Sequence, residues 1–326
     1  MPLFSFCVPT YRRAEFLGRT LSSALAQTVE DFEINVVDDC SPDDTAEVVR
    51  GFTDPRIRYV LNEKNLGVPE NLNRAMSLAM GEYLVLLEDH DLVDPTYLEE
   101  ARGIMTRHPN VGFVATGCLA IDEQDRPLEK YVSPFPEAME GRKLLRRLLT
   151  RTDCPFSVTA VIRRTALEGL DPLFDGRYGW YADQYLWWRL AAKTDFGYIA
   201  RPLLKLRVRE SDHLLSDRHW ESALMLDRIH KDNWGLLYPE GGLRSRWDRM
   251  RYEKAKTWSA ALVRGGKMLR GEPWTDEDER ASRAYLSSVG SFVLEGVGKV
   301  PIRLAARLRD AYKARHRDRT RLDGKC

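Results

Sequence analysis

Short apolar runs alternate with helical patterns through roughly the first hundred residues, and this alternation constrains the fold more than any other feature. The apolar runs span residues 3–8, 32–37, 57–60 and 83–87. The segments between them carry apolar residues at helical spacing. Strands that alternate with helices form crossover units and a parallel sheet. The sequence therefore predicts an α/β fold with a Rossmann-like, mostly parallel sheet flanked by helices.

Acidic residues begin where the fourth apolar run stops, with Glu88, Asp89 and Asp91 around His90. The run itself has the unbroken apolar pattern of a strand buried on both faces. Ligands of open α/β sheets bind at the carboxyl ends of the strands, where carboxylates can ligate a hard cation or accept hydroxyl groups. The alternative is a solvated acidic turn that caps the helix starting near Pro95.

The other strand ends are also polar. The first run ends at Pro9, Thr10 and Tyr11, the second at Asp38 and Asp39, and the third leads into a turn-rich segment at 62–67. A sheet edge with only a structural role does not require so many polar residues at its strand ends, so this edge is a candidate binding site. The chain lacks Gly-X-Gly-X-X-Gly after its first strand and has no Walker-type phosphate loop, which argues against a dinucleotide dehydrogenase or a Walker-type NTPase.

The second hundred residues continue the pattern less regularly. Strands are predicted at 111–115, extended by 117–121, and at 157–162, 196–200 and 203–208, with a short helix at 142–149 and a long surface loop at 122–140. A further helix begins near Asp183 and carries a buried stripe of Leu186, Trp187 and Leu190. Asp183 is either a helix-stabilising residue of the first turn or a functional carboxylate.

From about residue 216 the composition changes to long helical patterns, which predicts an α-helical C-terminal region over 216–326. Its last part, 301–326, has nine Lys and Arg against three Asp, whereas the whole chain has a net charge of +1. A basic amphipathic helix can lie on an anionic membrane as a peripheral contact, and the alternative is a solvated tail. The tail has no base-reading motif, so we expect no nucleic-acid partner.

The five cysteines are widely spaced and include no Cys-X-X-Cys pair. Reduced thiols fit this pattern best. There is no secretory signal pattern, and no apolar run approaches the length of about 20 residues that a membrane-spanning helix needs. We expect a cytoplasmic protein, with contact of the tail at the inner face of the membrane as an option; the sequence leaves the oligomeric state open.

Several motifs, in this order, resemble those of the inverting family-two glycosyltransferases, which have a GT-A fold and use nucleotide-activated sugars. They are Val8-Pro9-Thr10-Tyr11, Val36 to Ser41 with Asp43 and Thr45, Asn65-Leu66-Gly67, Asp89-His90-Asp91, and the segment from Tyr181 to Leu190. The resemblance covers residues 3 to about 213. It implies a GT-A domain over 1–215, with a nucleotide-binding half (1–115) and an acceptor half (116–215).

The resemblance also implies roles for individual residues. The positions expected at the nucleotide sugar are Pro9, Thr10, Tyr11, Arg13, Asp38, Asp39, Asn65, Gly67, Asn71, Asp89 and His90. Asp91 would ligate Mn²⁺ or Mg²⁺, with Asp89 and His213 as further candidate ligands and Asp89 lying nearer the ribose or sugar. Asp183 would be the catalytic base. This chemistry is reasonable, because a bridging cation stabilises a diphosphate leaving group and inversion needs one proton acceptor.

The sequence thus predicts a metal-dependent inverting glycosyltransferase that moves a sugar from a nucleotide-diphosphate donor, with UDP favoured, to the hydroxyl of a saccharide, lipid-linked or small-molecule acceptor. Such an enzyme would serve polysaccharide, glycolipid or natural-product glycosylation. Two departures from the family pattern are Ala182, where relatives usually have Glu, and Arg209, where they often have His. His213 is a candidate substitute for that histidine, and Arg207 or Arg209 a candidate diphosphate clamp.

These departures leave a catalytically inactive nucleotide-sugar-binding or scaffold protein as the alternative. A nucleotidyltransferase is a weaker alternative, because it would need a Gly-rich, basic phosphate loop after the first strand, and this chain has none.

Overall fold

The computed structural model describes residues 1–150, 159–209 and 219–240, together with residues 242, 246, 248, 249, 252, 275, 276, 278 and 280. The chain divides into two compact units. The first comprises Met1–Leu148, Asp153–Ser216 and Asp232–Pro239, and the second comprises the remaining residues.

The first unit contains ten strands, several helices and two short 3₁₀ helices. The strands are β1 (Phe4–Thr10), β2 (Phe32–Asp38), β3 (Ile57–Leu61), β4 (Tyr83–Leu86), β5 (Leu92–Val93), β6 (Val111–Ile121), β7 (Pro127–Tyr131), β8 (Ala138–Met139), β9 (Ala160–Arg163) and β10 (Asp195–Arg207). The helices are α1 (Ala14–Leu25), α2 (Thr45–Arg50), α3 (Val68–Leu78), α4 (Tyr97–Arg107), α5 (Gly141–Thr150), η1 (Arg164–Leu167), η2 (Gly176–Tyr181) and α6 (Ala182–Lys193).

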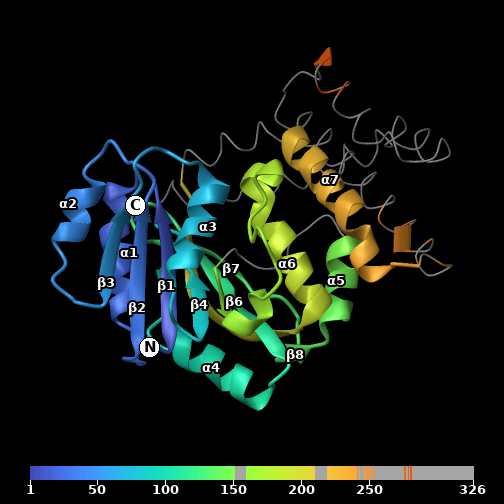
Figure 1. Ribbon diagram of the computed structural model, residues 1–326, viewed down its shortest axis with the longest axis horizontal. Helices are drawn as coiled ribbons and strands as arrows, with labels where there is room; N and C mark the ends of the chain where they lie inside the picture. Colours follow the sequence, from blue (N-terminus) through green and yellow to red (C-terminus); the bar gives the residue numbers. More distant parts are fainter. Residues whose placement is uncertain are drawn as a thin grey trace, which may run out of the picture. The chain divides into compact units, whose positions relative to one another are not determined.

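All these strands belong to one sheet with the order β3-β2-β1-β4-β9-β6-β10-β5, to which β7 and β8 attach at β6 and β10 (Figure 1). Strands β1 to β4 are mutually parallel, and β6 is parallel to β10. Strand β9 runs antiparallel between β4 and β6. The carboxyl ends of β1, β2 and β4 therefore meet at one edge. The predicted α/β fold with a mostly parallel sheet flanked by helices is confirmed.

Helices cover both faces of the sheet because the strands are apolar on both sides. Phe4, Phe6 and Val85 are fully buried on the face covered by α1 and α4. On the other face, α3 and α6 pack, and Trp187 of α6 stacks on Phe113 with ring centroids 5.7 Å apart. The predicted buried stripe of Leu186, Trp187 and Leu190 is confirmed, since each of these side chains is fully buried.

The prediction of a loop over 122–140 was wrong, because this segment contains β7 and β8. All five residues of β7 are exposed, so the strand shows none of the apolar alternation that reveals a half-buried strand. Backbone pairing with β6 alone makes it a strand. The two strands predicted at 196–200 and 203–208 are one continuous strand, β10, and β9 begins at Ala160.

Strand β10 is irregular in its middle. Thr116 and Gly117 are adjacent in β6, but their partners in β10, Ile199 and Pro202, are three residues apart. The buried Thr116 hydroxyl group donates to the Arg201 carbonyl oxygen at 2.6 Å, which satisfies a backbone group that the regular ladder leaves out. The irregularity is thus held by a specific side chain.

Helix α7 (His219–Leu237) runs from the second unit into residues of the first. In the second unit, the Tyr252 hydroxyl group donates to Asp227 at 3.0 Å, and the Tyr252 ring stacks on His230 at 4.1 Å. Among the described residues, no helix has the length and apolar character that crossing a membrane requires. The basic segment 301–326 lies outside the described residues.

We predict that Leu86→Ala lowers the free energy of unfolding by about 2–5 kcal/mol, because it leaves a cavity under the acidic strand end. Leu86 is fully buried in β4 between Cys7 and Ala160. Chemical denaturation followed by circular dichroism measures the change. The control Leu128→Ala removes a side chain that is 57% exposed and should change stability by less than about 0.5 kcal/mol. Equal effects of the two substitutions would contradict the described packing.

Candidate functional site

The loops after β1 and β2 form the first part of the candidate site. Thr10 and Asp38 are register partners at the strand ends, and the Asp39 N–H donates to the Thr10 carbonyl oxygen at 2.9 Å. Arg12 and Cys40 have φ values of 58° and 61°, a region that non-glycine residues rarely occupy. Such backbone strain is common at functional sites, and here both loops turn sharply at the same sheet edge.

Asp38 stabilises the loop after β2 through hydrogen bonds of its carboxylate. It is buried, and its carboxylate accepts hydrogen bonds from the Tyr59 hydroxyl group at 2.6 Å and from the Ser41 N–H at 2.8 Å. Burial, followed by this hydrogen bond and the Asp38 charge, raises the pKa of Tyr59. The Ser41 hydroxyl oxygen in turn accepts the Arg12 N–H at 2.9 Å, which joins the β2 loop to the β1 loop.

Asp39 organises the segment after β3. Its carboxylate accepts the N–H groups of Leu66 and Gly67 at 2.8 and 2.9 Å and the Asn62 side-chain amide at 2.8 Å. Gly67 has a φ value of 87°, which suits glycine, and it directly precedes α3. These contacts fix the position of the 62–67 segment beside the β2 loop.

Asn71 and Asn65 belong to the same network. The buried Asn71 oxygen accepts from the Asn62 amide at 2.9 Å, and its own amide donates to the Val37 carbonyl oxygen at 3.1 Å. Asn65 donates to the Asp39 carbonyl oxygen at 3.1 Å. The sequence reasoning missed Asn62, whose only local signal was its place in a turn-rich segment. The Asn71 side chain thus contacts the protein interior, and Asn65 is the exposed member of this group.

Asp89 connects the β4 end to the β1 loop. Its carboxylate accepts the Tyr11 N–H at 3.3 Å and lies 3.8 Å from the Arg13 Nε atom. The other contact is to His90, whose Nδ1 atom lies 3.0 Å from Asp89 Oδ1. Tyr11 itself is exposed, whereas Thr10 is buried. The structure therefore brings together predicted residues from two strand ends.

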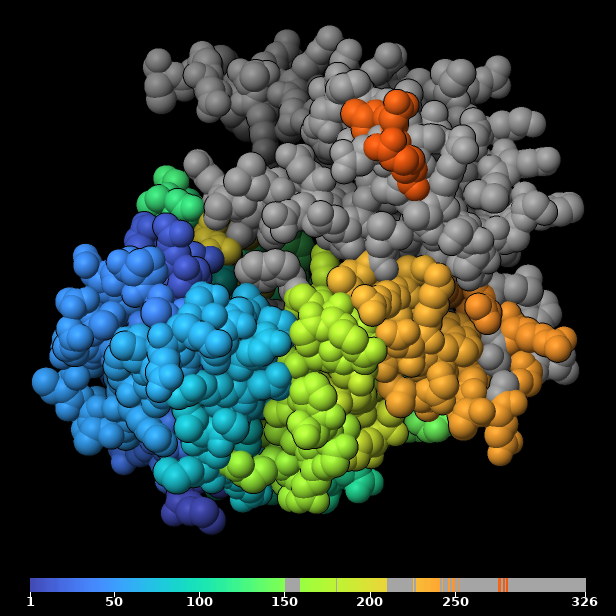
Figure 2. Space-filling view, turned by 45° about the horizontal axis from the view of Figure 1, so that its top comes forward, coloured from blue at the N-terminus to red at the C-terminus, as the bar shows by residue number. Residues whose placement is uncertain are grey.

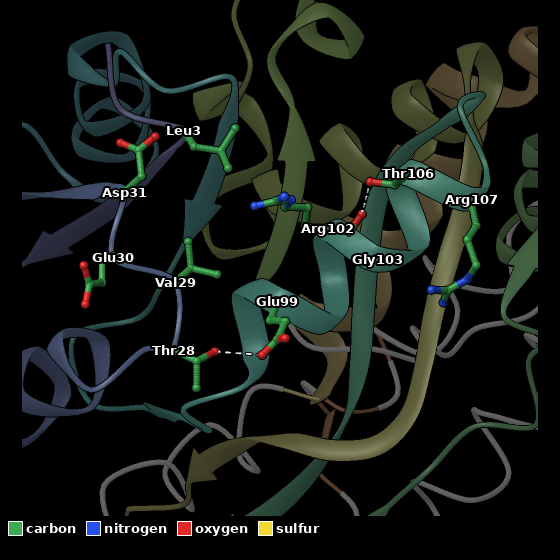
Figure 3. Close-up of a pocket in the computed structure, with 10 residues that line it drawn as sticks. All are labelled: Leu3, Thr28, Val29, Glu30, Asp31, Glu99, Arg102, Gly103, Thr106 and Arg107. Atoms are coloured by element: carbon green, nitrogen blue, oxygen red, sulfur yellow. Dashed lines mark hydrogen bonds between the residues drawn. The ribbon is translucent and has the colours of Figure 1, made fainter.

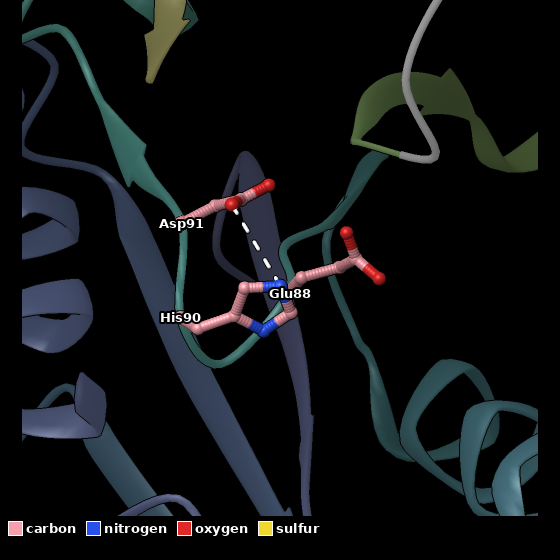
Figure 4. A group of neighbouring side chains, drawn as sticks. All are labelled: Glu88, His90 and Asp91. Carbon is pink, nitrogen blue, oxygen red and sulfur yellow. Dashed lines mark ion pairs between the residues drawn. The ribbon is translucent and has the colours of Figure 1, made fainter. Parts of the chain in front are cut away.

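Glu88, His90 and Asp91 each offer one ligand atom, and these atoms lie within 4.8 Å of one another (Figure 4). Asp91 is fully buried. Its Oδ1 atom accepts the Arg207 N–H at 2.9 Å, but its Oδ2 atom has no hydrogen-bond partner among the described residues. A buried carboxylate oxygen without a partner is costly, and a divalent cation with oxygen and imidazole ligands would satisfy it. The residues present therefore fit a divalent metal ion.

The ionisation of this group reflects its burial. Burial raises the pKa of Asp91 to about 6, and burial together with the charges of Asp91 and Asp89 raises the pKa of Glu88 to about 7. Burial alone would lower the pKa of His90, but the hydrogen bond to Asp89 and the nearby carboxylates outweigh it and raise that pKa to about 9. The raised pKa of His90 follows from the carboxylates that surround it.

Arg207 holds the acidic loop from the end of β10. The side chain is buried, and it donates to the carbonyl oxygens of His90 and Asp122, both at 2.8 Å. Its guanidinium group also pairs with Asp125 at 2.5 Å, and Arg19 of α1 pairs with the same carboxylate at 2.9 Å. The protein already occupies the guanidinium group of Arg207 in this structure, and its role as a diphosphate clamp stays a prediction, as does that of Arg209. His213 lies outside the described residues.

Asp183 lies in the first turn of α6, next to the nucleotide-side elements. Asn73 of α3 exchanges two hydrogen bonds with the backbone of Phe174, at 2.7 and 2.9 Å, and this pins the segment before η2 to α3. Figure 2 shows the α3 region against the segment that leads into α6. Burial raises the pKa of Asp183 to about 6, and its charge contributes to the raised pKa of Glu88. Asp183 is thus part of the same electrostatic group as the acidic loop.

Two further residues of α6, Arg189 and Ala182, differ in what they contribute near Asp183. Arg189 donates to the carbonyl oxygens of Pro172 and Leu173 at 2.7 and 2.6 Å and covers the Tyr185 ring at 4.0 Å, so it positions the preceding loop. Ala182, the departure from the family pattern, is buried and has no carboxylate to offer. Glu88 is the nearby carboxylate that the sequence reasoning did not select, although its place at the β4 end was a usable signal.

A separate cavity of about 830 Å³ lies away from these residues (Figure 3). Its lining residues precede β1 and β2 or belong to α4, and they include Leu3, Asp31 and Arg102. This is the amino-terminal side of the parallel strands, whereas the candidate site lies at their carboxyl ends. The chemistry described above therefore does not involve this cavity.

Comparison with known proteins identifies a family. Residues 5–171 match the family described as glycosyl transferase family 2. Validoxylamine A glucosyltransferase of Streptomyces hygroscopicus subsp. jinggangensis is 37% identical over 154 residues, which cover 44% of this chain and 36% of that protein. The first curated relatives are matched over only 55%, 29% and 36% of their own lengths.

Solved structures share the fold at low sequence identity. The S. aureus TarS fragment 1–349, crystallised with UDP, superposes with a TM-score of 0.65 at 18% identity, covering 99% of this chain and 92% of that chain. The mannosyltransferase PcManGT from Pyrobaculum calidifontis, in complex with GDP-Man and Mn²⁺, gives a TM-score of 0.51 at 19% identity, covering 91% and 86% of the two chains.

We predict that Arg207→Met destabilises the protein by about 1–3 kcal/mol, because it leaves buried carbonyl oxygens without their donor. Arg207→Lys should recover only part of this loss, since an ammonium group cannot reproduce the guanidinium fork. Urea unfolding gives the stability, and hydrogen exchange of the 88–93 segment reports local loosening. The control Arg126→Met removes an exposed arginine paired with Asp122 in the same turn and should have little effect. If Arg207→Met matches this control, Arg207 does not hold the loop.

Proposed function

The chain belongs to glycosyl transferase family 2, and we propose that it moves a sugar from a nucleotide-diphosphate donor to an acceptor hydroxyl group with inversion at the anomeric carbon. One observation carries the proposal. The loops after β1 and β2 lie at the same sheet edge as a buried acidic loop, in which one Asp91 oxygen has no hydrogen-bond partner among the described residues, and the Asp183 charge acts on Glu88 of that loop. Binding, charge neutralisation and proton removal are thus available within one site.

In the proposed function, residues 1–115 bind the nucleotide. Thr10, Tyr11 and Asp39 lie at the nucleoside, with Asp38 beneath them, and the segment after Asn65 covers the nucleotide. The Asp39 carboxylate accepts hydrogen bonds from the N–H groups of Leu66 and Gly67. The same side chain would therefore contact the nucleoside and position the segment that covers it. A UDP-sugar is the proposed donor. TarS has been crystallised with UDP and with UDP-GlcNAc, which supports this choice of class.

The proposed cofactor is Mn²⁺ or Mg²⁺, held by Asp91 with Asp89 close to the donor. PcManGT has been solved with Mn²⁺. A bound divalent cation neutralises negative charge that develops on a diphosphate leaving group. The unpaired, buried Oδ2 atom of Asp91 is the feature of this chain that supports such a ligand. Glu88 and His90 offer further ligand atoms.

Asp183 is the proposed catalytic base. Its raised pKa of about 6 makes it a better proton acceptor than an ordinary carboxylate while it remains ionised near neutral pH. Residues 116–215 would form the acceptor side, which includes β7 and its neighbouring loops. The acceptor is proposed only as a hydroxyl-bearing saccharide, lipid-linked molecule or small molecule.

We predict that Asp183→Asn lowers the transfer rate by about 10²–10⁴-fold, because the amide cannot accept the acceptor proton. Nucleotide binding should change little. In the unsubstituted protein, the rate should fall as the pH drops through about 6, since protonation removes the base. Formation of labelled product from a radiolabelled donor, measured at several pH values, tests both the loss of rate and its pH dependence. Asp54→Asn, which alters an ion pair with Arg56 before β3, is the control. Full activity in Asp183→Asn would refute this role.

We also predict that UDP and UDP-sugars raise the melting temperature more with Mn²⁺ than without it, because ligands that bind the folded state stabilise it by mass action. GDP and GDP-sugars serve as competitors, and Ca²⁺ as a cation control. Stabilisation without any turnover across a panel of donors and acceptors would favour the inactive binding or scaffold protein. A larger response to GDP than to UDP would overturn the donor assignment.

A further inference from the structure

His90 is held in an orientation that is typical of metal-ligating histidines. We propose that His90 ligates the divalent cation through Nε2 and that Asp89 orients it from outside the coordination sphere, so that the site prefers transition metals such as Mn²⁺ over Mg²⁺. This inference rests on the metal-dependent transfer proposed above and specifies which atoms hold the metal.

The geometry around the imidazole ring distinguishes its two nitrogen atoms. Nδ1 lies 3.0 Å from Asp89 Oδ1, within hydrogen-bond distance. Nε2 faces Asp91 and lies 4.0 Å from its Oδ1 atom. Metal-ligating histidines usually donate their other N–H to a carboxylate or carbonyl group, which fixes the tautomer and the ring orientation. Asp89 provides that carboxylate, and Nε2 is left for a ligand on the Asp91 side.

The partner atoms needed for a metal ion are present on that side. Asp91 is fully buried, and its Oδ2 atom has no hydrogen-bond partner among the described residues. Glu88 offers a further carboxylate oxygen, and the ligand atoms of Glu88, His90 and Asp91 lie within 4.8 Å of one another. Metal–ligand bonds of about 2.0–2.6 Å allow opposite ligands to be about 4–5 Å apart. The three side chains are therefore close enough to share one cation, and Figure 4 shows the imidazole ring of His90 facing Asp91.

The alternative arrangement uses the carboxylates of Asp89 and Asp91 and leaves His90 out. In this structure, Asp89 is already engaged on both oxygens. Oδ2 accepts the Tyr11 N–H at 3.3 Å, and Oδ1 contacts His90 and lies 3.8 Å from Arg13 Nε. These contacts direct Asp89 toward the β1 loop, whereas His90 Nε2 is directed toward Asp91.

The identity of the ligands determines which cation binds best. Mg²⁺ and Ca²⁺ prefer oxygen ligands alone, and Mn²⁺ also suits carboxylates, but an imidazole nitrogen adds more affinity for a transition metal than for Mg²⁺. A site with one imidazole and two carboxylates therefore favours Mn²⁺ and Co²⁺ over Mg²⁺ more than a site made of carboxylates alone. Removal of the imidazole should reduce this preference selectively.

The test uses the untagged full chain with Mn²⁺ and UDP. Pulsed electron paramagnetic resonance should detect nitrogen coupling to the bound Mn²⁺, and titration calorimetry gives Mn²⁺ and Mg²⁺ affinities separately. His90→Gln should abolish the coupling and weaken Mn²⁺ binding about 10-fold or more, while Mg²⁺ binding changes by less than about threefold. Asp89→Asn retains an oxygen acceptor for Nδ1, so the coupling should persist.

His108→Gln is the matched control, because His108 is exposed and pairs with Glu137 at 3.1 Å. Coupling that persists in His90→Gln but disappears in His213→Gln would overturn the proposal. Equal losses of Mn²⁺ and Mg²⁺ affinity in Asp89→Asn, with no effect of His90→Gln, would also overturn it and leave the proposed metal-dependent transfer intact. If neither cation binds with or without UDP, both proposals fail.

Discussion

Burial of the acidic loop after β4 is the constraint on which the site depends. Carboxylates are stable in a protein interior only when positive charges and N–H donors compensate for lost water. In this protein the compensation comes from His90, whose Nδ1 atom contacts Asp89, and from Arg207, whose side chain donates to the loop backbone and whose main-chain N–H donates to Asp91. One Asp91 oxygen remains unsatisfied among the described residues, so the loop is stable yet retains capacity for a ligand.

Contacts between loops help to hold this edge together. Asp39 positions the segment after β3, Ser41 joins the β2 loop to the β1 loop, and Asp89 joins the β4 end to Tyr11. Asn73 then ties α3 to the segment that leads into α6 and Asp183. Hydrogen bonds therefore connect the elements that carry the proposed nucleotide contacts and the segment that precedes the proposed base.

The sequence predicted the sheet well because buried parallel strands are unbroken apolar runs, as at 83–87, and because helices between them have their own period. It failed for β7, whose exposed residues have no such pattern. For the site, residue type at a strand end identified Asp89 and Asp91 as candidates, whereas Asp183, at the start of a helix, was identified through the family resemblance. The sequence could not predict which groups each side chain contacts. Arg207 could have faced solvent or substrate, and only the three-dimensional structure shows that it donates to the His90 and Asp122 carbonyl oxygens.

The irregular middle of β10 has a consequence for how this chain tolerates change. Successive side chains of a strand point to opposite faces, so the number of residues between Ile199 and Leu204 determines which face Arg207 reaches. Loss or gain of a single residue in this stretch would turn the arginine toward the opposite face and leave the acidic loop without its brace. The Thr116 hydroxyl group holds these residues in place, and their number determines the face on which Arg207, at the far end of the strand, reaches the acidic loop.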